Sequence, residues 1–194
     1  MEKLIISIKQ FVELNKNDVE IVTKLFKRKL INKGELFLKE GLVCDNLAFI
    51  EKGLLRHFIN DEGRDITYHF SMENDFVCDY QSFINRLPSL KNIVTIENTS
   101  VYLISDQDLQ IFYQTISTGE RFGRLLLEKI FSNAITHIIS THTDSAEQRY
   151  LKFLSAFPEL GQRVPQYYVA SFICVKPPSL SRIRKKIANN NFLT

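Results

Sequence analysis

Near the start of the chain, apolar residues recur every three or four positions, as they do on one face of a helix. Residues 4–29 therefore predict short helices, with Asn17 and Asp18 as candidate N-terminal caps. The apolar positions that share a face in this stretch are Val19, Val22, Leu25 and Phe26. A different pattern begins at Lys33.

From Lys33 onward, short apolar or alternating runs replace the helical spacing. The runs are KGELFLKEG, NLAFIEKGLLRHFIND, RDITYHFSM and IVTIENTSVYLIS. Glycines separate several of them, and NDEG at residues 60–63 is typical of a hairpin turn. Short strands at near-regular spacing predict a β-roll or jelly-roll barrel.

Helical spacing returns near Asp106. SDQDLQIFYQTI predicts a short helix, and GERFGRLLLEKIFSNAITHIISTHTD predicts a long one at residues 119–144. A long helix that is apolar on more than one side usually has two partners, here its own barrel and the same helix of a second chain. The candidate dimer interface consists of Leu127, Phe131, Ala134 and Ile138, and Leu126, Ile130 and Ile135 widen this stripe. The alternative is a helix buried within one protomer.

The C-terminal part predicts further helices. SAEQRYLKFLSAF reads as a helix with Tyr150, Leu151, Leu154 and Phe157 on one face, and PELGQRVP then breaks the chain.

The segment VPQYYVASFICVKPPSLSRIRKKIANN has the spacing of a helix-turn-helix. Two helices that cross steeply need a small residue where they touch, and Ala170 holds that position, with the turn four residues later at Cys174. Cys174 stands where a positive φ favours glycine, and Lys176 stands where a Ser or Thr cap is usual. The apolar residues that flank the turn and line the second helix are Val169, Ile173, Val175, Leu180 and Ile183.

Two prolines precede the basic residues of the second helix. Pro177 or Pro178 lies in its first turn, where the missing N–H costs nothing and the fixed φ favours helix entry. The start of this helix is expected to enter the DNA major groove, with Arg182 at a guanine edge and Ser179 at a phosphate or base. The candidate phosphate contacts are Arg184, Lys185 and Lys186. The alternative is a basic amphipathic helix that packs within its own domain.

This order of parts resembles the Crp/Fnr family of bacterial transcription regulators. The most specific part of the resemblance is ASFICVKPPSLSRIRKKI, and KGELFLKEG…LAFIEKGLLRHF is a moderately specific match to the family's β-roll. The resemblance implies an α+β fold in three parts: a cyclic-nucleotide-binding-like β-roll sensor (1–116), a long dimerisation helix (117–143) and a C-terminal helical (winged) helix-turn-helix domain (144–194). The chain ends at Thr194, which leaves little room for strands after the second helix.

The resemblance also implies partners and contact residues. The expected partners are a second copy of the chain, double-stranded DNA with a two-fold symmetric promoter site and, as a further candidate, RNA polymerase. The implied DNA contacts are Lys176, Pro177, Pro178, Ser179, Ser181, Arg182, Arg184, Lys185 and Lys186.

The sensor half departs from the cyclic-nucleotide-binding pattern. Members that bind cyclic nucleotides have a Gly-Glu pair followed about ten residues later by an Arg that holds the phosphate. Here the Gly-Glu place holds Val77, Cys78 and Asp79, and the Arg place falls near Ser89. Arg86 and Lys91 lie nearby without aligning. We therefore expect no response to cyclic AMP; a small-molecule effector is unknown or absent.

The charge distribution agrees with a nucleic-acid partner. The net charge is only +3, but from Ser145 onward eight Lys or Arg stand against two Glu. The basic tail thus follows a mildly acidic body, although a solvated charged face gives the same count. With 44% hydrophobic and 24% charged residues, the chain is an ordinary globular one, and it has no membrane span or signal peptide, so we expect it in the cytoplasm.

Signals for catalysis or metal binding are weak. His57 and His69 lie on presumed strands, a placement also found in metal-binding cupins and haem sensors. No third ligand accompanies them at a fixed spacing. The three cysteines, Cys44, Cys78 and Cys174, are too few for a cluster and too far apart in sequence for a zinc motif. We therefore expect no enzyme, no catalytic residues, no metal and no cofactor. The alternatives left open are a small-molecule-binding β-roll protein with a protein-interaction helical tail and a cupin-type enzyme.

Overall fold

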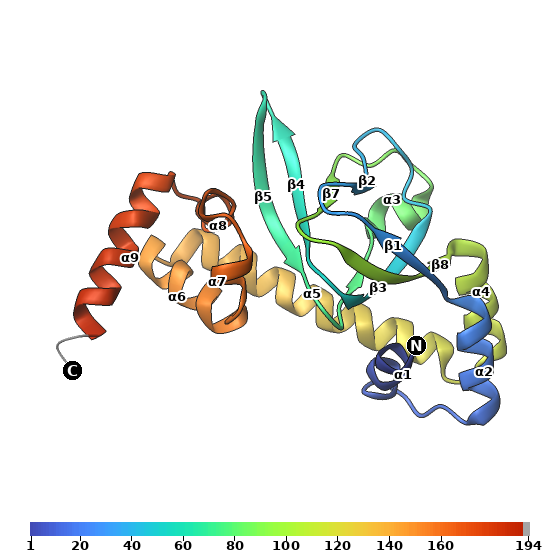
Figure 1. Cartoon of the computed structure of the whole chain (residues 1–194). Coiled ribbons are helices and arrows are strands. Elements are labelled where there is room, and N and C mark those ends of the chain that lie inside the picture. Colours follow the sequence, from blue (N-terminus) through green and yellow to red (C-terminus); the bar gives the residue numbers. More distant parts are fainter. Residues whose placement is uncertain (192–194) are drawn as a thin grey trace. The chain divides into compact units, whose positions relative to one another are not determined.

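The computed structural model describes residues 1–191, which form two compact units (Figure 1). The first unit contains residues 1–60 and 69–130, and the second contains residues 61–68 together with the chain from residue 131 onward. The long helix α5 (Gly119–Thr143) contributes its first half to one unit and its second half to the other. The predicted long helix is thus confirmed almost to the residue.

Two helices open the first unit, α1 (Glu2–Lys9) and α2 (Lys16–Leu25). The cap of α2 is Asn15, two residues before Asn17, the first of the two predicted caps: its side chain accepts from the Asp18 amide at 2.9 Å. Asp18 is the third helical residue, and its carboxylate accepts from the Asn15 amide at 3.0 Å. This reciprocal pair is a capping box, so the prediction of Asn17 or Asp18 as the cap was wrong.

The β-roll consists of two four-stranded sheets with the orders β1-β8-β3-β6 and β2-β7-β4-β5. Its strands are β1 (Lys27–Ile31), β2 (Leu36–Leu38), β3 (Asn46–Lys52), β4 (Leu55–Asp61), β5 (Arg64–Ser71), β6 (Phe76–Val77), β7 (Asn92–Thr95) and β8 (Thr99–Ser105). The predicted β-roll is confirmed and begins one strand earlier than Lys33. β4 and β5 are joined by Glu62 and Gly63, whose φ values of 51° and 82° give the two-residue hairpin expected at NDEG.

The core of the first unit lies between the sheets and the flanking helices. Phe49, Ile50 and Leu55 are fully buried. Helix α4 (Asp106–Thr115), capped by Ser105, follows the last strand as predicted, whereas α3 (Tyr80–Asn85) was not predicted.

Aromatic contacts fix the start of α5 within this unit. Phe122 lies 5.4 Å from Phe76, 5.7 Å from Phe11 and 5.7 Å from Phe112, measured between ring centroids. Edge-to-face pairs of this kind add to the free energy gained by burial.

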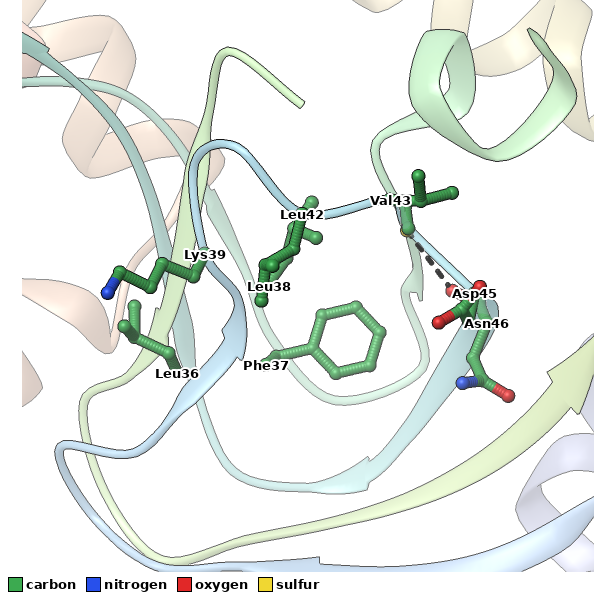
Figure 2. Close-up of a pocket in the computed structure, with 9 residues that line it drawn as sticks. Leu36, Phe37, Leu38, Lys39, Leu42, Val43, Asp45 and Asn46 are labelled. Carbon is green, nitrogen blue, oxygen red and sulfur yellow. Dashed lines mark hydrogen bonds between the residues drawn. The ribbon is translucent and has the colours of Figure 1, made fainter. Parts of the chain in front are cut away.

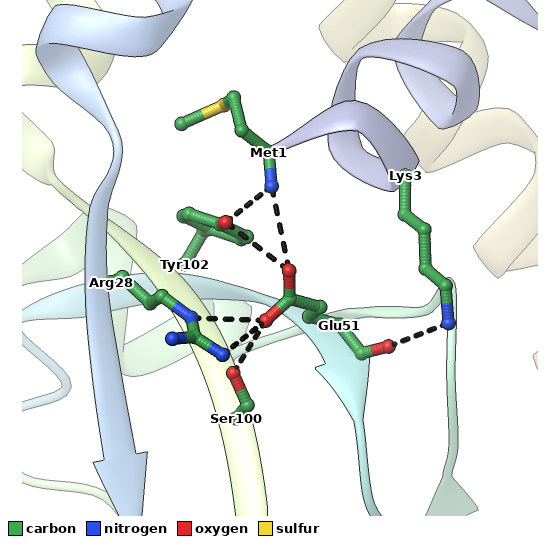
Figure 3. Close-up of polar contacts among 6 residues, drawn as sticks. All are labelled: Met1, Lys3, Arg28, Glu51, Ser100 and Tyr102. Carbon is green, nitrogen blue, oxygen red and sulfur yellow. Dashed lines mark hydrogen bonds and ion pairs between the residues drawn. The ribbon is translucent and has the colours of Figure 1, made fainter.

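A polar cluster around Glu51 joins β1, β3, β8 and the first residue of the chain (Figure 3). The Glu51 carboxylate accepts from the Ser100 hydroxyl at 2.7 Å, the Arg28 guanidinium at 3.0 Å and the Tyr102 hydroxyl at 3.2 Å. The Met1 amino group donates to the Tyr102 hydroxyl and lies 3.4 Å from the carboxylate. The bond from Ser100 and those from Arg28 and Tyr102 lower the pKa of Glu51 to about 2, against the effect of burial.

From residue 131 to residue 191 the second unit consists of helices and the turns that connect them. Besides the end of α5 it contains α6 (Ala146–Ala156), α7 (Leu160–Arg163), α8 (Gln166–Phe172) and α9 (Pro177–Asn191). Within this described range no wing strand is present, in contrast to the winged form that the resemblance allowed. The predicted buried face of α6 was also partly wrong: Tyr150 and Phe153 are buried, whereas Leu151 is 46% exposed.

Candidate nucleic-acid interface

Helices α8 and α9 and the turn between them form the predicted helix-turn-helix. Val169 and Ala170 of α8 have no exposed surface, and Leu180 of α9 is 1% exposed. Ile173, at the start of the turn, is also buried, while Val175 and Ile183 are half-buried. The apolar positions selected by spacing therefore face the interior of this small domain, and Ala170 is buried without a large side chain at the crossing.

The turn has the hydrogen bonds of a Schellman motif. The Val175 amide donates to the Ala170 carbonyl at 2.9 Å, and the Cys174 amide donates to the Ser171 carbonyl at 3.0 Å. Cys174 has a φ of 57°, in the left-handed region that was expected at this position. The motif ends α8 at a fixed point and thereby sets the direction in which α9 begins.

Helix α9 begins at Pro177, as the sequence predicted. The amides of Ser179 and Leu180 donate to the Lys176 carbonyl at 2.9 and 3.3 Å. Pro177 has no N–H to leave unpaired at this position, so it starts the helix without cost.

The exposed and buried residues of α9 lie on opposite faces. Leu180 and Ile183 point toward the domain core, with Ile187 one turn further on and half-buried. The opposite face, which we call the α9 outer face, consists of Pro178, Ser181, Arg182 and Lys185. These four residues are spaced i, i+3, i+4 and i+7, and each is exposed.

The structure places eight of the nine predicted DNA contacts on α9 and the ninth, Lys176, directly before it. Ser179 is half-buried, and the other eight are exposed: Lys176, Pro177, Pro178, Ser181, Arg182, Arg184, Lys185 and Lys186. Arg184 and Lys186 flank the α9 outer face on its two sides. Such an arrangement offers one apolar and three polar side chains to a groove and places further cations beside it.

Two polar residues of α6 support α9 and the turn, and the sequence analysis missed both. Glu147 accepts from Lys186 at 2.6 Å, which gives one predicted phosphate contact a partner within the domain. Arg149 donates from Nε to the Ile173 carbonyl at 2.8 Å and from Nη1 to the Asp144 carbonyl at 2.6 Å. Arg149 therefore ties the turn of the helix-turn-helix to the start of α6.

Residues 65–67 of β5 contact α8 within the second unit. The Thr67 amide donates to the Ser171 hydroxyl at 2.9 Å, and this hydroxyl lies 3.4 Å from the Asp65 carbonyl. On α5, the His137 ring stacks on Phe172 at 4.8 Å, and burial lowers the pKa of His137. Both contacts join segments that are far apart in the sequence, so no local sequence pattern could predict them.

The predicted dimer-interface residues remain largely uncovered in the single chain. Phe131 is 69% exposed and Ile138 is 52% exposed, Ala134 is exposed and Leu127 is half-buried. Ile130, Ile135 and Ile139 of the same helix are also 40–55% exposed. A helix with this many exposed large apolar residues presents a surface suited to burial against another chain.

The β-roll holds the other residues considered from sequence. His57 is buried, its Nε2 lies 2.9 Å from the Ser71 hydroxyl, and its ring lies 5.1 Å from that of His69. Burial, with smaller effects of His69 and Lys91, holds the pKa of His57 well below its usual value. Burial likewise raises the pKa of Cys44 and Cys78. In the described part of the chain, no three His, Cys, Asp or Glu side chains form a group suited to a metal ion.

A cavity of about 390 Å³ lies beside β2 (Figure 2). It is lined by residues 36–39 and 42–46, that is, by β2 and the segment that leads to β3. Leu36 and Leu42 line it with substantial exposure, and Asp45 and Asn46 lie at one side of it. Its volume falls in the range of small-molecule sites.

Comparison with known proteins agrees with these observations. Residues 28–116 match the family model of the cyclic nucleotide-binding domain. FixK2 from Bradyrhizobium japonicum superposes with a TM-score of 0.75 at 14% identity, over 86% of each chain. The chain has the Crp/Fnr fold.

Two further structures support this conclusion. The c-di-GMP-responsive global regulator CLP of Xanthomonas campestris has a TM-score of 0.69 at 15% identity, over 91% of this chain and 93% of its own. The catabolite activator protein of Thermus thermophilus has a TM-score of 0.59 at 16% identity, over 95% of this chain and 88% of its own. A search of curated protein sequences gave no match. Among the described residues, no helix has the length and apolar character needed to cross a bilayer.

Proposed function

We propose that the protein is a sequence-specific DNA-binding transcription regulator that acts as a homodimer. The observation that carries the proposal is the α9 outer face, where Pro178, Ser181, Arg182 and Lys185 are exposed on a helix whose start is fixed by the turn. The Crp/Fnr fold and the basic charge of the C-terminal part support it. Such a regulator acts in the cytoplasm, and an activator of this kind would also contact RNA polymerase.

The roles of the α9 residues follow from their chemistry. Arg182 lies in the second turn of the helix and is the best placed to form a bidentate pair with guanine O6 and N7. Ser181 and Ser179 offer hydroxyl donors, and Pro178 offers apolar contact. Lys185 and Arg184 lie farther along the helix and are suited to phosphate.

The exposed stripe of α5 supports dimerisation. Burial of apolar area contributes about 25 cal/mol per Å², so Phe131 and Ile138 each gain on the order of 1–2 kcal/mol when covered by a second copy. A two-fold dimer would place its two α9 helices in major grooves one helical turn apart, about 34–36 Å, and would read a symmetric site.

The deciding experiment is selection of bound duplexes from a random pool, followed by gel-shift titration of the selected sequence at several salt concentrations. We expect enrichment of two inverted half-sites and an affinity that falls steeply with salt, because bound Lys and Arg displace counterions. The variant Arg182→Ala/Lys185→Ala should lose the selected binding. Lys16→Ala/Lys24→Ala removes the same charge from exposed positions of α2 and should not.

A second candidate function is suggested by the cavity beside β2, namely small-molecule binding by the β-roll with a helical tail that contacts proteins. The two proposals separate in the same titration. A protein-contact module has no salt-sensitive affinity for duplex DNA and enriches no half-site, and that result would favour the second candidate.

A further inference from the structure

An ion pair between a buried carboxylate, Asp79, and a partly exposed cation, Lys91, lies in the β-roll. Asp79, between β6 and α3, is 4% exposed, and its carboxylate lies 2.7 Å from the Lys91 ammonium. The Ser89 hydroxyl donates to the other carboxylate oxygen at 2.8 Å. Both oxygens of Asp79 are therefore held by donors from a single loop, residues 86–91.

This loop is itself fixed to the segment before β3. The Ser89 amide donates to the Leu42 carbonyl at 2.9 Å, and the Gly41 amide donates to the Ser89 carbonyl at 2.8 Å. The Ser89 hydroxyl also accepts from the Lys91 amide at 2.9 Å. The Asp79 carboxylate thus connects α3, the 86–91 loop and the segment leading to β3.

The charges of the site balance within the chain. Burial alone would raise the pKa of Asp79, but the bonds from Lys91 and Ser89 outweigh it and keep the pKa below its usual value. Arg86, the other cation that the sequence placed here, is paired with Asp45 at 2.5 Å and donates to the Cys44 carbonyl at 3.1 Å. Both cations of the 86–91 loop already have an internal carboxylate.

The pair lies within the region that matches the cyclic nucleotide-binding domain. A cyclic nucleotide presents a single anionic phosphate, which requires charge-assisted donors where it is buried. Here Lys91 and Ser89 could donate to a phosphate, but both already donate to the Asp79 carboxylate. An incoming anion would have to displace the Asp79 carboxylate from Lys91 and Ser89 and would meet its negative charge, which is buried and therefore weakly screened by water. The residues present therefore do not fit a cyclic phosphate at this place.

We propose that the Asp79 carboxylate serves as an internal anion for the β-roll, so that α3 and the 86–91 loop are ordered without an anionic ligand. The consequence for regulation, DNA binding that needs no anionic effector, rests on the proposed function. The ordering of the β-roll does not rest on it.

Chemical rescue tests this role through thermal unfolding, which is measured without DNA. Asp79→Ala should lower Tm by about 5 °C or more, because it removes the buried carboxylate that accepts hydrogen bonds from Ser89 and Lys91 and so holds the 86–91 loop. Sodium formate at about 100 mM should restore part of the loss relative to sodium chloride at the same concentration, since formate fits the space of the deleted carboxylate. Asp45→Ala removes the partner of Arg86 at an exposed position and should show neither effect.

Two further measurements complete the test. Cyclic AMP, cyclic GMP and inorganic phosphate at about 1 mM should leave the Tm of the unaltered protein unchanged within about 1 °C. Asp79→Asn, which keeps the side-chain shape, should become more stable in phosphate, because Lys91 is then free to bind an anion. A rise in the Tm of the unaltered protein with a cyclic nucleotide would overturn the proposal. Equal Tm values for Asp79→Ala and Asp45→Ala would overturn it as well.

Discussion

The Lys186 ammonium lies 2.6 Å from a carboxylate oxygen of Glu147, so one cation of α9 is bound to α6 within its own domain. The lysine side chain is 63% exposed and the glutamate side chain 31%, which makes this a surface pair worth about 0.2–1 kcal/mol. DNA phosphate and Glu147 therefore compete for Lys186. This competition makes Lys186 different from Lys185, which forms no ion pair with any residue in the described part of the chain.

Removing Glu147 should strengthen DNA binding. In Glu147→Gln the lysine is released, and we expect a gain in affinity of a few-fold and a salt dependence steeper by up to about one counterion. Gel-shift titration across salt concentrations measures both. The control is the double variant Glu147→Gln/Lys186→Ala, compared with Lys186→Ala alone. These two proteins should bind DNA equally. If the double variant binds more tightly than Lys186→Ala, the glutamate acts by general repulsion of DNA rather than through Lys186.

Arg182 and Lys185 should differ in what their loss does to sequence preference. Arg182→Ala is expected to cost about 1–3 kcal/mol on the selected site and little on random duplex, because a guanine contact exists only in the specific complex. Lys185→Ala should weaken binding to both duplexes alike, as a phosphate contact does. Equal losses on selected and random DNA for Arg182→Ala would show that this arginine does not contact a base.

The exposed stripe of α5 should hold two copies of the chain together. Phe131→Asp should shift the protein from dimer to monomer, because it places a charge where a large apolar side chain would be buried. Leu30→Asp is the matched control, since Leu30 is also 69% exposed but lies on β1. Sedimentation velocity distinguishes the two variants, and dimers that survive Phe131→Asp would place the interface elsewhere.

The sequence predicted the features that depend on neighbouring residues and missed those that depend on residues far apart in the chain. The helix-turn-helix was recognisable because its requirements are local: Ala170 four residues before Cys174, and Pro177 in the first turn of the next helix. The partners of Lys186 and Ser171 depend on segments far away in sequence, which no spacing rule places together. The error on α6 has the same origin, since the position of its neighbours decides whether Leu151 or Phe153 is buried.

The same distinction holds in the β-roll. Glycines and alternating runs predicted its strands and the turn at Glu62 and Gly63, because turn geometry is a property of a few adjacent residues. The pairing of Asp79 with Lys91 required the 86–91 loop to fold back over the start of α3. From sequence alone, Lys91 was only a cation near the position of the phosphate-binding arginine that does not align with it.

The left-handed conformation of Cys174 should carry a small energetic cost. A side chain at a φ of 57° is disfavoured relative to glycine, so Cys174→Gly is expected to stabilise the protein by about 0.5–1 kcal/mol. Cys174→Val should destabilise it by a larger amount, because a β-branched residue tolerates this region poorly. Urea unfolding compares the three proteins. If the glycine variant is less stable, the thiol makes a contact that outweighs the backbone term.

Acid should weaken the polar cluster around Glu51. Its pKa of about 2 in the folded protein lies below the ordinary value of 4.5, so its ionised form stabilises the fold fully above about pH 4.5. This contribution falls as the pH drops from 4.5 toward 2, because the unfolded chain takes up the proton first. Between pH 6 and pH 3 the unaltered protein should therefore lose more stability than Glu51→Gln, which cannot ionise. Asp45→Asn, which changes an exposed carboxylate outside the cluster, should lose as much stability over this pH range as the unaltered protein. If the free energy of unfolding falls equally with pH in Glu51→Gln and in the unaltered protein, Glu51 is not the source of the acid sensitivity.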